Sequence, residues 1–403
     1  MVGTSRSYEA SHRWISFQLE TREFPRSLWV LLGEAASKIE HIAGVPLKPS
    51  VAAEMHRLYL AKGVLATTAI EGNTLSEDEV RLRLDGKLRL PDSREYLGQE
   101  VDNVARACTE IWQGIERAEP DRLSLQLVER YNALVLEGLR LEEGVVAGVI
   151  RNHPVVVGTY RGAPAEDCRY LVERLCEWLE HPSFTGDGVG AELRVPVAIL
   201  QAILAHLYIA WIHPFGDGNG RTARLIEFQL LLRAGFPTPA AHLLSNHYNL
   251  TRSDYYRALD QARRPGGVTE FIAYAVRGLV DGLREQIEAI RGQQMGLAWK
   301  DYVSEVLRGS GPTSDRQRTL VLSLSGQRPS TPRQIVELTP ALARLYATKT
   351  AKTLTRDLNT LQKAGLVERT PEGYVAATEM ISAFLPRRSR RHERRTDPAG
   401  RGN

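Results

Sequence analysis

A single stretch, residues 213–224 with the sequence HPFGDGNGRTAR, constrains what this chain can fold into more than any other. Its three glycines, Gly216, Gly218 and Gly220, lie close together and leave the backbone free to take positive φ angles. An apolar run over residues 197–212 precedes the stretch, and apolar residues at helical spacing follow it. The pattern therefore predicts a glycine-rich loop between a buried helix and the N-terminus of the next helix.

The charged residues of this loop indicate a phosphate site. Unpaired N–H groups and the positive dipole end at a helix N-terminus favour anions, and Arg221 and Arg224 lie on one face of the first turn. Asp217 is a hard oxygen ligand, and His213 enters from the other side. The stretch lacks the GK[ST] ending of a Walker A loop, and a helix rather than a strand precedes it. We expect a site for a polyphosphate and a divalent cation; a plain helix–helix connection with a core histidine is the alternative.

The same residues resemble the motif of the Fic family (the Fido fold), HxFx[D/E]GNGRxxR, at every fixed position. The resemblance implies transfer of AMP from ATP to a protein hydroxyl with release of pyrophosphate, so ATP and Mg²⁺ are the implied substrate and cofactor. It implies that His213 is the general base, for which an imidazole pKa near ~6.5 is suitable, and that Asp217 holds the metal. It also implies α- and β-phosphate contacts from Asn219, Gly220 and Arg221, a γ-phosphate contact from Arg224, and further nucleotide contacts from Asp217 and Gly218.

An N-terminal helical pattern, residues 51–72, ends in TTAIEGN, which Gly72 can close. Glu71 near a helix C-terminus opposes the dipole and so needs a cationic partner; an ordinary capped last turn is the other interpretation. The stretch resembles the inhibitory motif of the Fic family, [S/T]xxxE[G/N], at Thr67, Glu71 and Gly72. The resemblance implies that Glu71 pairs with Arg224 and inhibits the enzyme.

Residues 148–167 predict a short hairpin, because consecutive valines favour a strand and Gly158 favours a turn. A surface loop is the alternative. Fic proteins have a hairpin flap here that aligns the target hydroxyl, which implies nucleotide-site contacts from Val157, Gly158, Thr159 and Tyr160. The resemblance also implies that Tyr255 and Tyr256 enclose the adenine, although Arg263 stands where many members have Asn.

The chain changes character from about residue 299 onward. Thr331 and Pro332 begin a helix, a second helix follows residue 348 with an apolar stripe, and residues 366–376 predict a hairpin. This order resembles a winged helix-turn-helix. Such a module can place a recognition helix in DNA or can bind a protein, and the sequence leaves both partners open.

The composition of the chain excludes several classes of protein. Of 403 residues, 43% are hydrophobic and 25% are charged, which is typical of a globular chain of two or three domains. Three cysteines without metal-ligand spacing favour a cytoplasmic location. The N-terminus lacks the apolar core of a signal peptide, and polar residues interrupt the apolar run 195–212, so we expect a buried core helix and no membrane partner. The net charge of +4 comes from the arginine-rich C-terminal end.

We therefore predict a mainly α protein with a Fido helical core, a short β-hairpin flap and a C-terminal winged helix domain. The predicted segments are 1–50 (N-terminal helices), 51–295 (Fic domain, with an inhibitory helix at about 60–73 and a catalytic core at about 125–285), 296–386 (winged helix) and 387–403 (basic disordered tail). The predicted function is a protein adenylyltransferase autoinhibited by Glu71. Removal of AMP at the same site and a nucleotide-binding transcription regulator are the alternatives. The target, the nucleotide, self-modification and a homodimer stay open.

Overall fold

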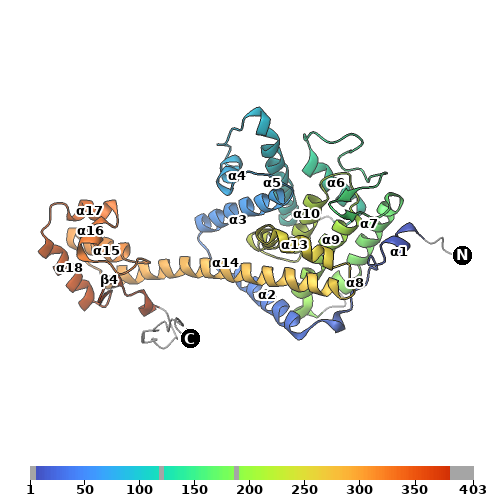
Figure 1. The fold of residues 1–403 in the computed structure, drawn as a ribbon. Helices are drawn as coiled ribbons and strands as arrows, with labels where there is room; N and C mark the ends of the chain where they lie inside the picture. The colour runs from blue at the N-terminus through green and yellow to red at the C-terminus, as the bar shows by residue number, and fades with distance from the viewer. Residues whose placement is uncertain (1–5, 118–121, 186–189, 382–403) are drawn as a thin grey trace, which may run out of the picture. The chain divides into compact units, whose positions relative to one another are not determined.

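The structure, a computed structural model, describes residues 6–117, 122–185 and 190–381. It divides into two compact units, unit 1 (Met1–Ile287) and unit 2 (Glu288–Asn403) (Figure 1). Helices make up most of each unit, and the strands in the described residues form two two-stranded hairpins, which confirms the mainly α class. The predicted tail 387–403 lies outside the described residues.

Unit 1 is built from helices, with one short hairpin at its surface. Its elements are α1 (Ser7–Ser11), η1 (Thr21–Glu23), α2 (Arg26–Gly44), α3 (Pro49–Ala69), α4 (Glu77–Leu84), η2 (Asp92–Arg94), α5 (Glu95–Glu116), α6 (Leu125–Leu136), β1 (Val156–Val157), β2 (Tyr160–Arg161), α7 (Ala165–Leu179), α8 (Pro182–Thr185), η3 (Ala191–Leu193), α9 (Arg194–Ile212), α10 (Asn219–Arg233), α11 (Thr238–Ala241), α12 (Leu243–Leu250), α13 (Arg252–Gln261) and the first part of α14 (Gly267–Val306).

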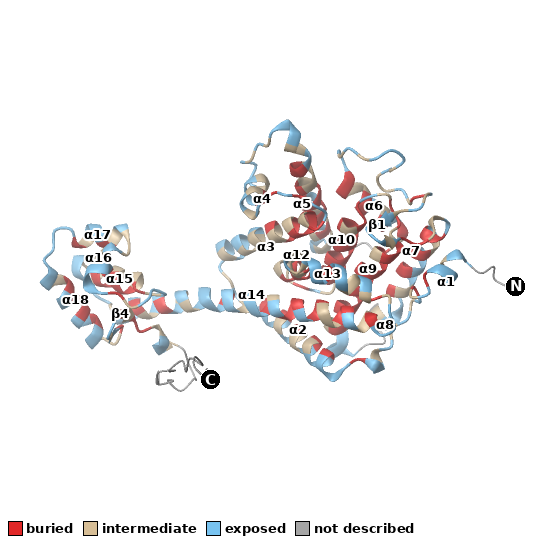
Figure 2. Ribbon diagram, viewed as in Figure 1, coloured by how far each residue is buried: buried red, intermediate tan, exposed pale blue. Residues whose placement is uncertain are grey.

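The centre of unit 1 is the pair α9 and α10, which are buried along nearly their whole length (Figure 2). α9 packs against α10, α7 and α2, and α10 also packs against α5 and α6. The segment Ala191–Ile212 is long and apolar enough to cross a membrane, but 83% of its most apolar window is buried inside the structure. The expected core helix is therefore present, and it ends at the glycine-rich loop.

Local signals position the helix ends around this core. Ser76 and Glu79 form the capping box that starts α4, with the Ser76 hydroxyl accepting a hydrogen bond from the Glu79 N–H. Pro49 occupies the first turn of α3, where a missing N–H costs nothing. α14 is one continuous helix, and the division between the units falls within it, a little before the predicted boundary at 295/296.

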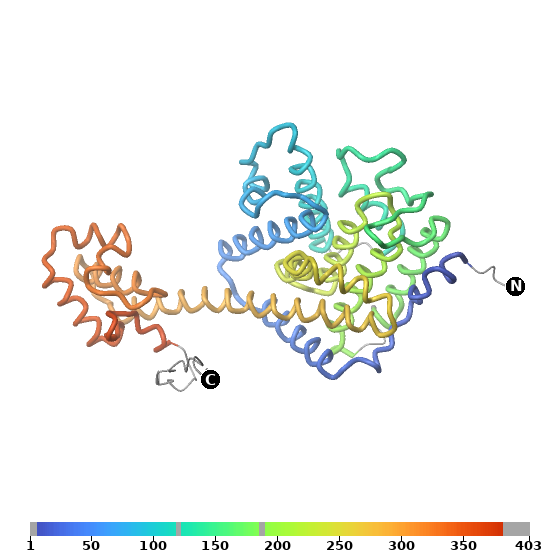
Figure 3. Tube along the Cα trace, viewed as in Figure 1, coloured from blue at the N-terminus to red at the C-terminus, as the bar shows by residue number. Residues whose placement is uncertain are grey.

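An N-terminal segment lies along α7 and the hairpin, and Figure 3 traces it in blue. The Asp167 carboxylate of α7 accepts hydrogen bonds from the Tyr8 N–H (2.8 Å) and from the Arg6 guanidinium (3.3 Å). His12 Nε2 lies 3.0 Å from the carbonyl oxygen of Arg161 in β2. The segment therefore packs against one side of the hairpin.

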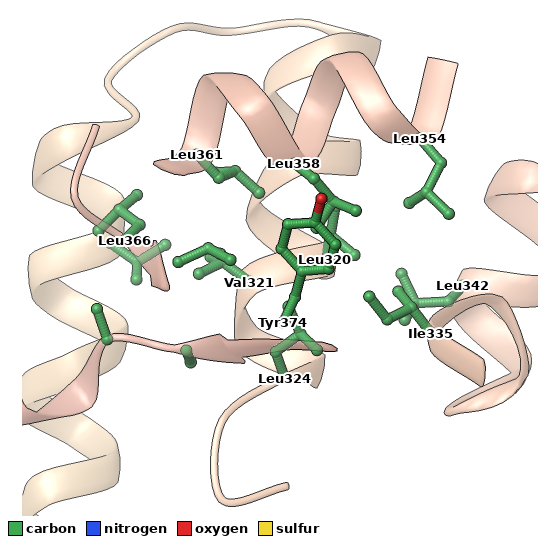
Figure 4. Packing of buried hydrophobic residues seen from close by; sticks show 14 of the residues in the cluster. Leu320, Val321, Leu324, Ile335, Leu342, Leu354, Leu358, Leu361, Leu366 and Tyr374 are labelled. Carbon is green, nitrogen blue, oxygen red and sulfur yellow. The ribbon is translucent and has the colours of Figure 1, made fainter. Parts of the chain in front are cut away.

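Unit 2 contains the remainder of α14, then α15 (Pro312–Ser323), α16 (Pro332–Glu337), α17 (Pro340–Tyr346), α18 (Ala351–Lys363), β3 (Val367–Thr370), β4 (Gly373–Ala376) and η4 (Thr378–Ile381). Its core consists of apolar side chains from all of these helices and from the hairpin (Figure 4). Thr331 caps α16 through a capping box with Gln334. β3 and β4 pair antiparallel, and Ser330 forms an additional antiparallel bridge with Tyr374. The assignment of this unit as a winged helix-turn-helix is a proposal.

Candidate active site

The loop between α9 and α10 has the sharp backbone turns that its sequence predicts, but it uses its glycines differently. His213 ends α9 with φ 50° and Gly218 precedes α10 with φ 76°. Gly216 and Gly220 do not take positive φ angles. A Cβ on Gly220 would lie 2.0 Å from Glu71 Oε1, so this glycine makes room for a carboxylate rather than for a turn.

Asn219 holds the loop in shape. Its side-chain NH₂ donates to the Phe215 carbonyl and its Oδ1 accepts from the Phe215 N–H, both at 2.9 Å. Asn132 of α6 adds a bond from its side-chain NH₂ to the Asp217 carbonyl (2.8 Å). Because the first residues of a helix have no intrahelical acceptor, the N–H groups of the first turn of α10 are available to an anion.

His213 is partly buried beside this helix start. Burial and the nearby Arg151 charge lower the pKa of His213 to about 4, although the Ala210 carbonyl and the carboxylates of Glu71 and Asp217 act in the opposite direction. Nδ1 lies 3.4 Å from the Ala210 carbonyl oxygen, which can only accept, so Nδ1 carries the proton. The imidazole is therefore neutral at pH 7, with its Nε2 lone pair able to accept a proton.

Arg151 holds the backbone on which His213 is placed. It is buried, and its guanidinium donates to the carbonyl oxygens of His213 (2.7 Å), His153 (2.7 Å) and Ala163 (2.5 Å). Its own N–H donates to the Pro214 carbonyl at 2.9 Å. Arg151 thus joins the catalytic loop to both ends of the hairpin segment, a role that no local sequence pattern signals.

Glu71 and Arg224 form the ion pair that the inhibitory motif implies. Glu71 Oε1 lies 2.6 Å from Arg224 Nη2, which also donates to the Thr67 carbonyl at 2.9 Å. Burial raises the pKa of Glu71, but the Arg224 charge and hydrogen bond outweigh it, so this pKa lies below its usual range. Gly72 follows with φ 102° and turns the chain after α3. Glu71 therefore engages Arg224 at the start of α10.

Arg221 is also held by carboxylates. It lies 3.1 Å from Asp217 Oδ1 and 3.2 Å from Oε1 of Glu100, a residue of α5 that sequence reasoning missed. Asn73 donates to Glu100 Oε2 at 2.8 Å and so connects Glu100 to the segment 67–73, which carries Glu71. The pKa of Glu100 is raised above its usual value, because burial outweighs the opposing hydrogen bond from Asn73 and the Arg221 charge. Both arginines of the motif are thus paired with acids in this structure.

A cavity of about 440 Å³ lies beside the loop. It brings together many of the predicted site residues: Glu71, Val157, Gly158, Thr159, Tyr160, His213, Gly220, Tyr255 and Tyr256. Ile70, Ala210, Trp211, Leu259, Asp260 and Arg263 complete its lining. Gly218, Asn219, Arg221, Arg224, Asp217, Thr67 and Gly72 do not line it. They lie in the adjoining helix start or in the segment 67–73.

The two tyrosines differ in their surroundings. Tyr255 is buried, its hydroxyl lies 2.9 Å from His206 Nε2, and its ring stacks on Tyr248. Tyr256 is exposed and donates to the Ile70 carbonyl (3.1 Å), so it contacts the segment 67–73 directly. Arg263 lies over the rings of Trp14 and Tyr160, at 5.7 and 5.0 Å from their centroids.

Asp217 can contribute to a magnesium site only as one ligand among several. Its side chain is half exposed, and the described residues contain no group of three acidic, histidine or cysteine side chains that could hold a metal. Mg²⁺ characteristically takes one or two carboxylates together with substrate phosphates and water. The residues present fit a metal that arrives with a nucleotide.

Comparison with known proteins agrees with this geometry. Residues 122–231 match the model of the Fic/DOC family. Protein adenylyltransferase fic-1 of Caenorhabditis elegans is 29% identical over 57% of this chain and 41% of its own length. Protein adenylyltransferase Fic of Nematostella vectensis is 28% identical over 52% of this chain and 45% of its own length. The chain thus spans less than half the length of these relatives.

Solved structures show the same fold. A Fic family protein from Desulfovibrio desulfuricans G20 aligns with a TM-score of 0.54 at 22% identity, covering 89% of this chain and 98% of its own. Fic-1 from C. elegans aligns with a TM-score of 0.56 at 24% identity, covering 66% of this chain and 74% of its own. The family motif is complete at residues 213–224 and the matched region runs from α6 into α10, so this part of the chain is similar to the Fic/DOC family in both sequence and fold.

Proposed function

We propose that this chain is a protein adenylyltransferase that moves AMP from ATP to a Ser, Thr or Tyr hydroxyl of a protein. The target oxygen forms a bond to the α-phosphorus, the bond to the β-phosphate oxygen breaks, and pyrophosphate leaves. The observation that carries the proposal is that His213 and Gly220, at the start of α10, line the same cavity. The Nε2 of His213 would take the proton of the attacking hydroxyl.

The remaining residues would position the nucleotide. The first-turn N–H groups of α10 and the Arg221 guanidinium suit the α- and β-phosphates, and Arg224 suits the γ-phosphate. Asp217 would hold Mg²⁺, which neutralises phosphate charge when it is bound. Because the Glu71 carboxylate is paired with Arg224, the conformation of this structure would be an inhibited one.

The hairpin β1–β2 suits docking of the target. Val156 and Val157 are exposed, and the N-terminal segment lies against β2 rather than β1. β1 therefore offers a strand edge to a target segment, since unpaired edge groups accept another strand. The chain's own hydroxyl residues could be modified in the same way. Its three cysteines are buried and free, which supports a reducing cytoplasmic location.

The test uses the Glu71→Gly background, in which the proposed inhibition is removed. His213→Ala should reduce incorporation of labelled AMP into protein by about 10²–10⁴, while ATP binding is retained, because the phosphate contacts come from α10. His41→Ala, which removes an exposed histidine, is the matched control. Near-parental transfer by the His213→Ala variant would overturn the assignment.

Two further arms address the alternatives. Incubation with each of the four nucleoside triphosphates, followed by mass spectrometry of modified proteins, identifies the nucleotide that is transferred. Release of AMP from premodified protein measures the reverse reaction, in which Glu71 would position water. Release by the parent chain, without any transfer by Glu71→Gly, would favour removal of AMP over its addition.

A further inference from the structure

We propose that unit 2 binds duplex DNA, with the exposed face of α18 lying in the major groove. The proposal uses residues of unit 2 only and is independent of the proposed transferase activity. It rests on the chemistry of one helix face, on a buried network that fixes how that helix is rotated, and on the order of the elements around it.

The outer face of α18 is polar and basic. Figure 2 shows much of this helix in pale blue, the colour of exposed residues. The exposed side chains on one face are Lys352, Thr355, Arg356, Asn359 and Lys363, which recur along the helix at helical spacing. The same residues line one shallow surface depression. Within the described residues, Lys352, Arg356 and Lys363 have no ion-pair partner. Lys349, just before the helix, adds a further exposed cation.

The single acid of α18 is turned away from this face. Asp357 is buried and accepts hydrogen bonds from Arg316 (2.7 and 3.2 Å), Gln317 (3.0 Å) and Tyr346 (2.9 Å). These donors come from α15 and α17, so they fix the rotation of α18 about its own axis. Leu354, Leu358 and Leu361 are buried on the same side (Figure 4). This buried network and the buried leucines therefore orient the basic face of α18 toward solvent.

The elements around α18 suit a groove-binding helix. α16, α17 and α18 follow one another, and the β3–β4 hairpin comes next. Ser330, just before α16, pairs with Tyr374 of β4 and so holds the hairpin beside the start of α16. α18 has 13 residues, or roughly 20 Å at 1.5 Å per residue, and the major groove of about 12 Å width admits a helix. Glu372 at the hairpin turn is exposed, so we place the phosphate contacts on α18 and Lys349 rather than on the hairpin tip.

The composition of this face fits DNA better than a protein surface. The cores of protein interfaces are apolar and depleted in charge, whereas this face carries lysine, arginine, threonine and asparagine. Lysines at the ends of the helix match backbone phosphates. Arg356 matches the O6 and N7 acceptors of guanine, and Asn359 matches N6 and N7 of adenine. The structure thus assigns charge contacts to Lys352 and Lys363 and base contacts to Arg356 and Asn359.

The experiment titrates a fluorescently labelled 24-base-pair duplex of random sequence with the full chain at several salt concentrations. Lys352→Ala/Arg356→Ala/Lys363→Ala should weaken binding at least tenfold and reduce the slope of log affinity against log salt by about 2, because two phosphate contacts are lost at about 0.9 each. The control Lys300→Ala/Arg308→Ala/Arg328→Ala removes the same charge from exposed sites elsewhere in unit 2 and should change both quantities little.

Two additional comparisons separate the proposal from general charge attraction. The titration is repeated with a chain ending at residue 386, because the arginine-rich tail can bind DNA by itself. Arg356→Lys should keep the salt slope but change the sequences that the chain selects from a random duplex pool. Absence of DNA binding by a folded chain, equal effects of the two triple variants, or binding that disappears with the tail alone would each overturn the proposal. The first of these outcomes would favour a protein partner for this face.

Discussion

Replacement of Glu71 by glycine tests the regulatory geometry most directly. Glu71 Oε1 lies 2.6 Å from Nη2 of Arg224, whose side chain is only 1% exposed, so the contact is a charged hydrogen bond that is largely shielded from water. The same oxygen lies close over Gly220 in the first turn of α10. The carboxylate thus occupies the space that suits an anion, and it engages the guanidinium that we propose binds the γ-phosphate.

The size of the effect follows from this contact. A hydrogen bond to a charged group contributes about 1.5–3 kcal/mol, and each 1.4 kcal/mol corresponds to a factor of ten. We therefore expect Glu71→Gly to raise transfer of AMP, self-modification included, by roughly 10- to 150-fold at equal ATP concentration. Glu71→Gln keeps the size of the side chain but removes its charge, so its gain should be intermediate.

The assay is incorporation of labelled AMP by the parent, Glu71→Gly, Glu71→Gln and the double variant Glu71→Gly/Arg224→Ala. The double variant should lose most of the gain, because Arg224 is the group that the first substitution releases. Melting temperatures measured in parallel exclude unfolding as the cause. Equal incorporation by the parent and Glu71→Gly would show that TTAIEG is only a helix end and that the ion pair does not control the site.

Three other features of the structure give testable expectations. Burial lowers the pKa of His213 to about 4 and of His242 to about 3, so the unfolded chain binds more protons below pH ~6.5. The stability that these two neutral histidines contribute should be fully present above that pH and should fall as the pH drops toward 4. His242→Leu should therefore reduce the difference between the urea midpoints of unfolding at pH 7 and pH 4.5. An unchanged difference would contradict this. Arg151→Met removes the donors that hold the His213 backbone, so kcat in the Glu71→Gly background should fall at least tenfold with little change in KM for ATP; a change in KM alone would refute this positioning role. Asp357→Asn leaves Arg316 without its ionic partner and should destabilise unit 2 by on the order of 3 kcal/mol, seen as an earlier unfolding transition, whereas an unshifted transition would show that the network is dispensable.

The sequence by itself determined the elements whose signals are local. The stretch 213–224 predicted a loop between a buried helix and a helix N-terminus, because glycine spacing and apolar periodicity act over a few residues. The capping box at Ser76, the start of α16 at Thr331 and the hairpin at residues 156–161 are also where the sequence indicated them. The pairing of Glu71 with Arg224 came from resemblance to a family motif, since nothing local connects two residues so far apart in the chain.

The tertiary structure decided everything that depends on segments meeting across the fold. Arg151, Asn132 and Glu100 reach the catalytic loop from other segments, and each sits in a stretch whose own sequence predicts only a helix or a loop. Gly220 faces the carboxylate of Glu71, in the turn after α3, so its function is close approach rather than a turn. The direction in which α18 presents its basic face depends on the donors that Asp357 meets on α15 and α17. Side-chain periodicity predicts which residues share a helix face, but only packing against neighbours determines what that face contacts.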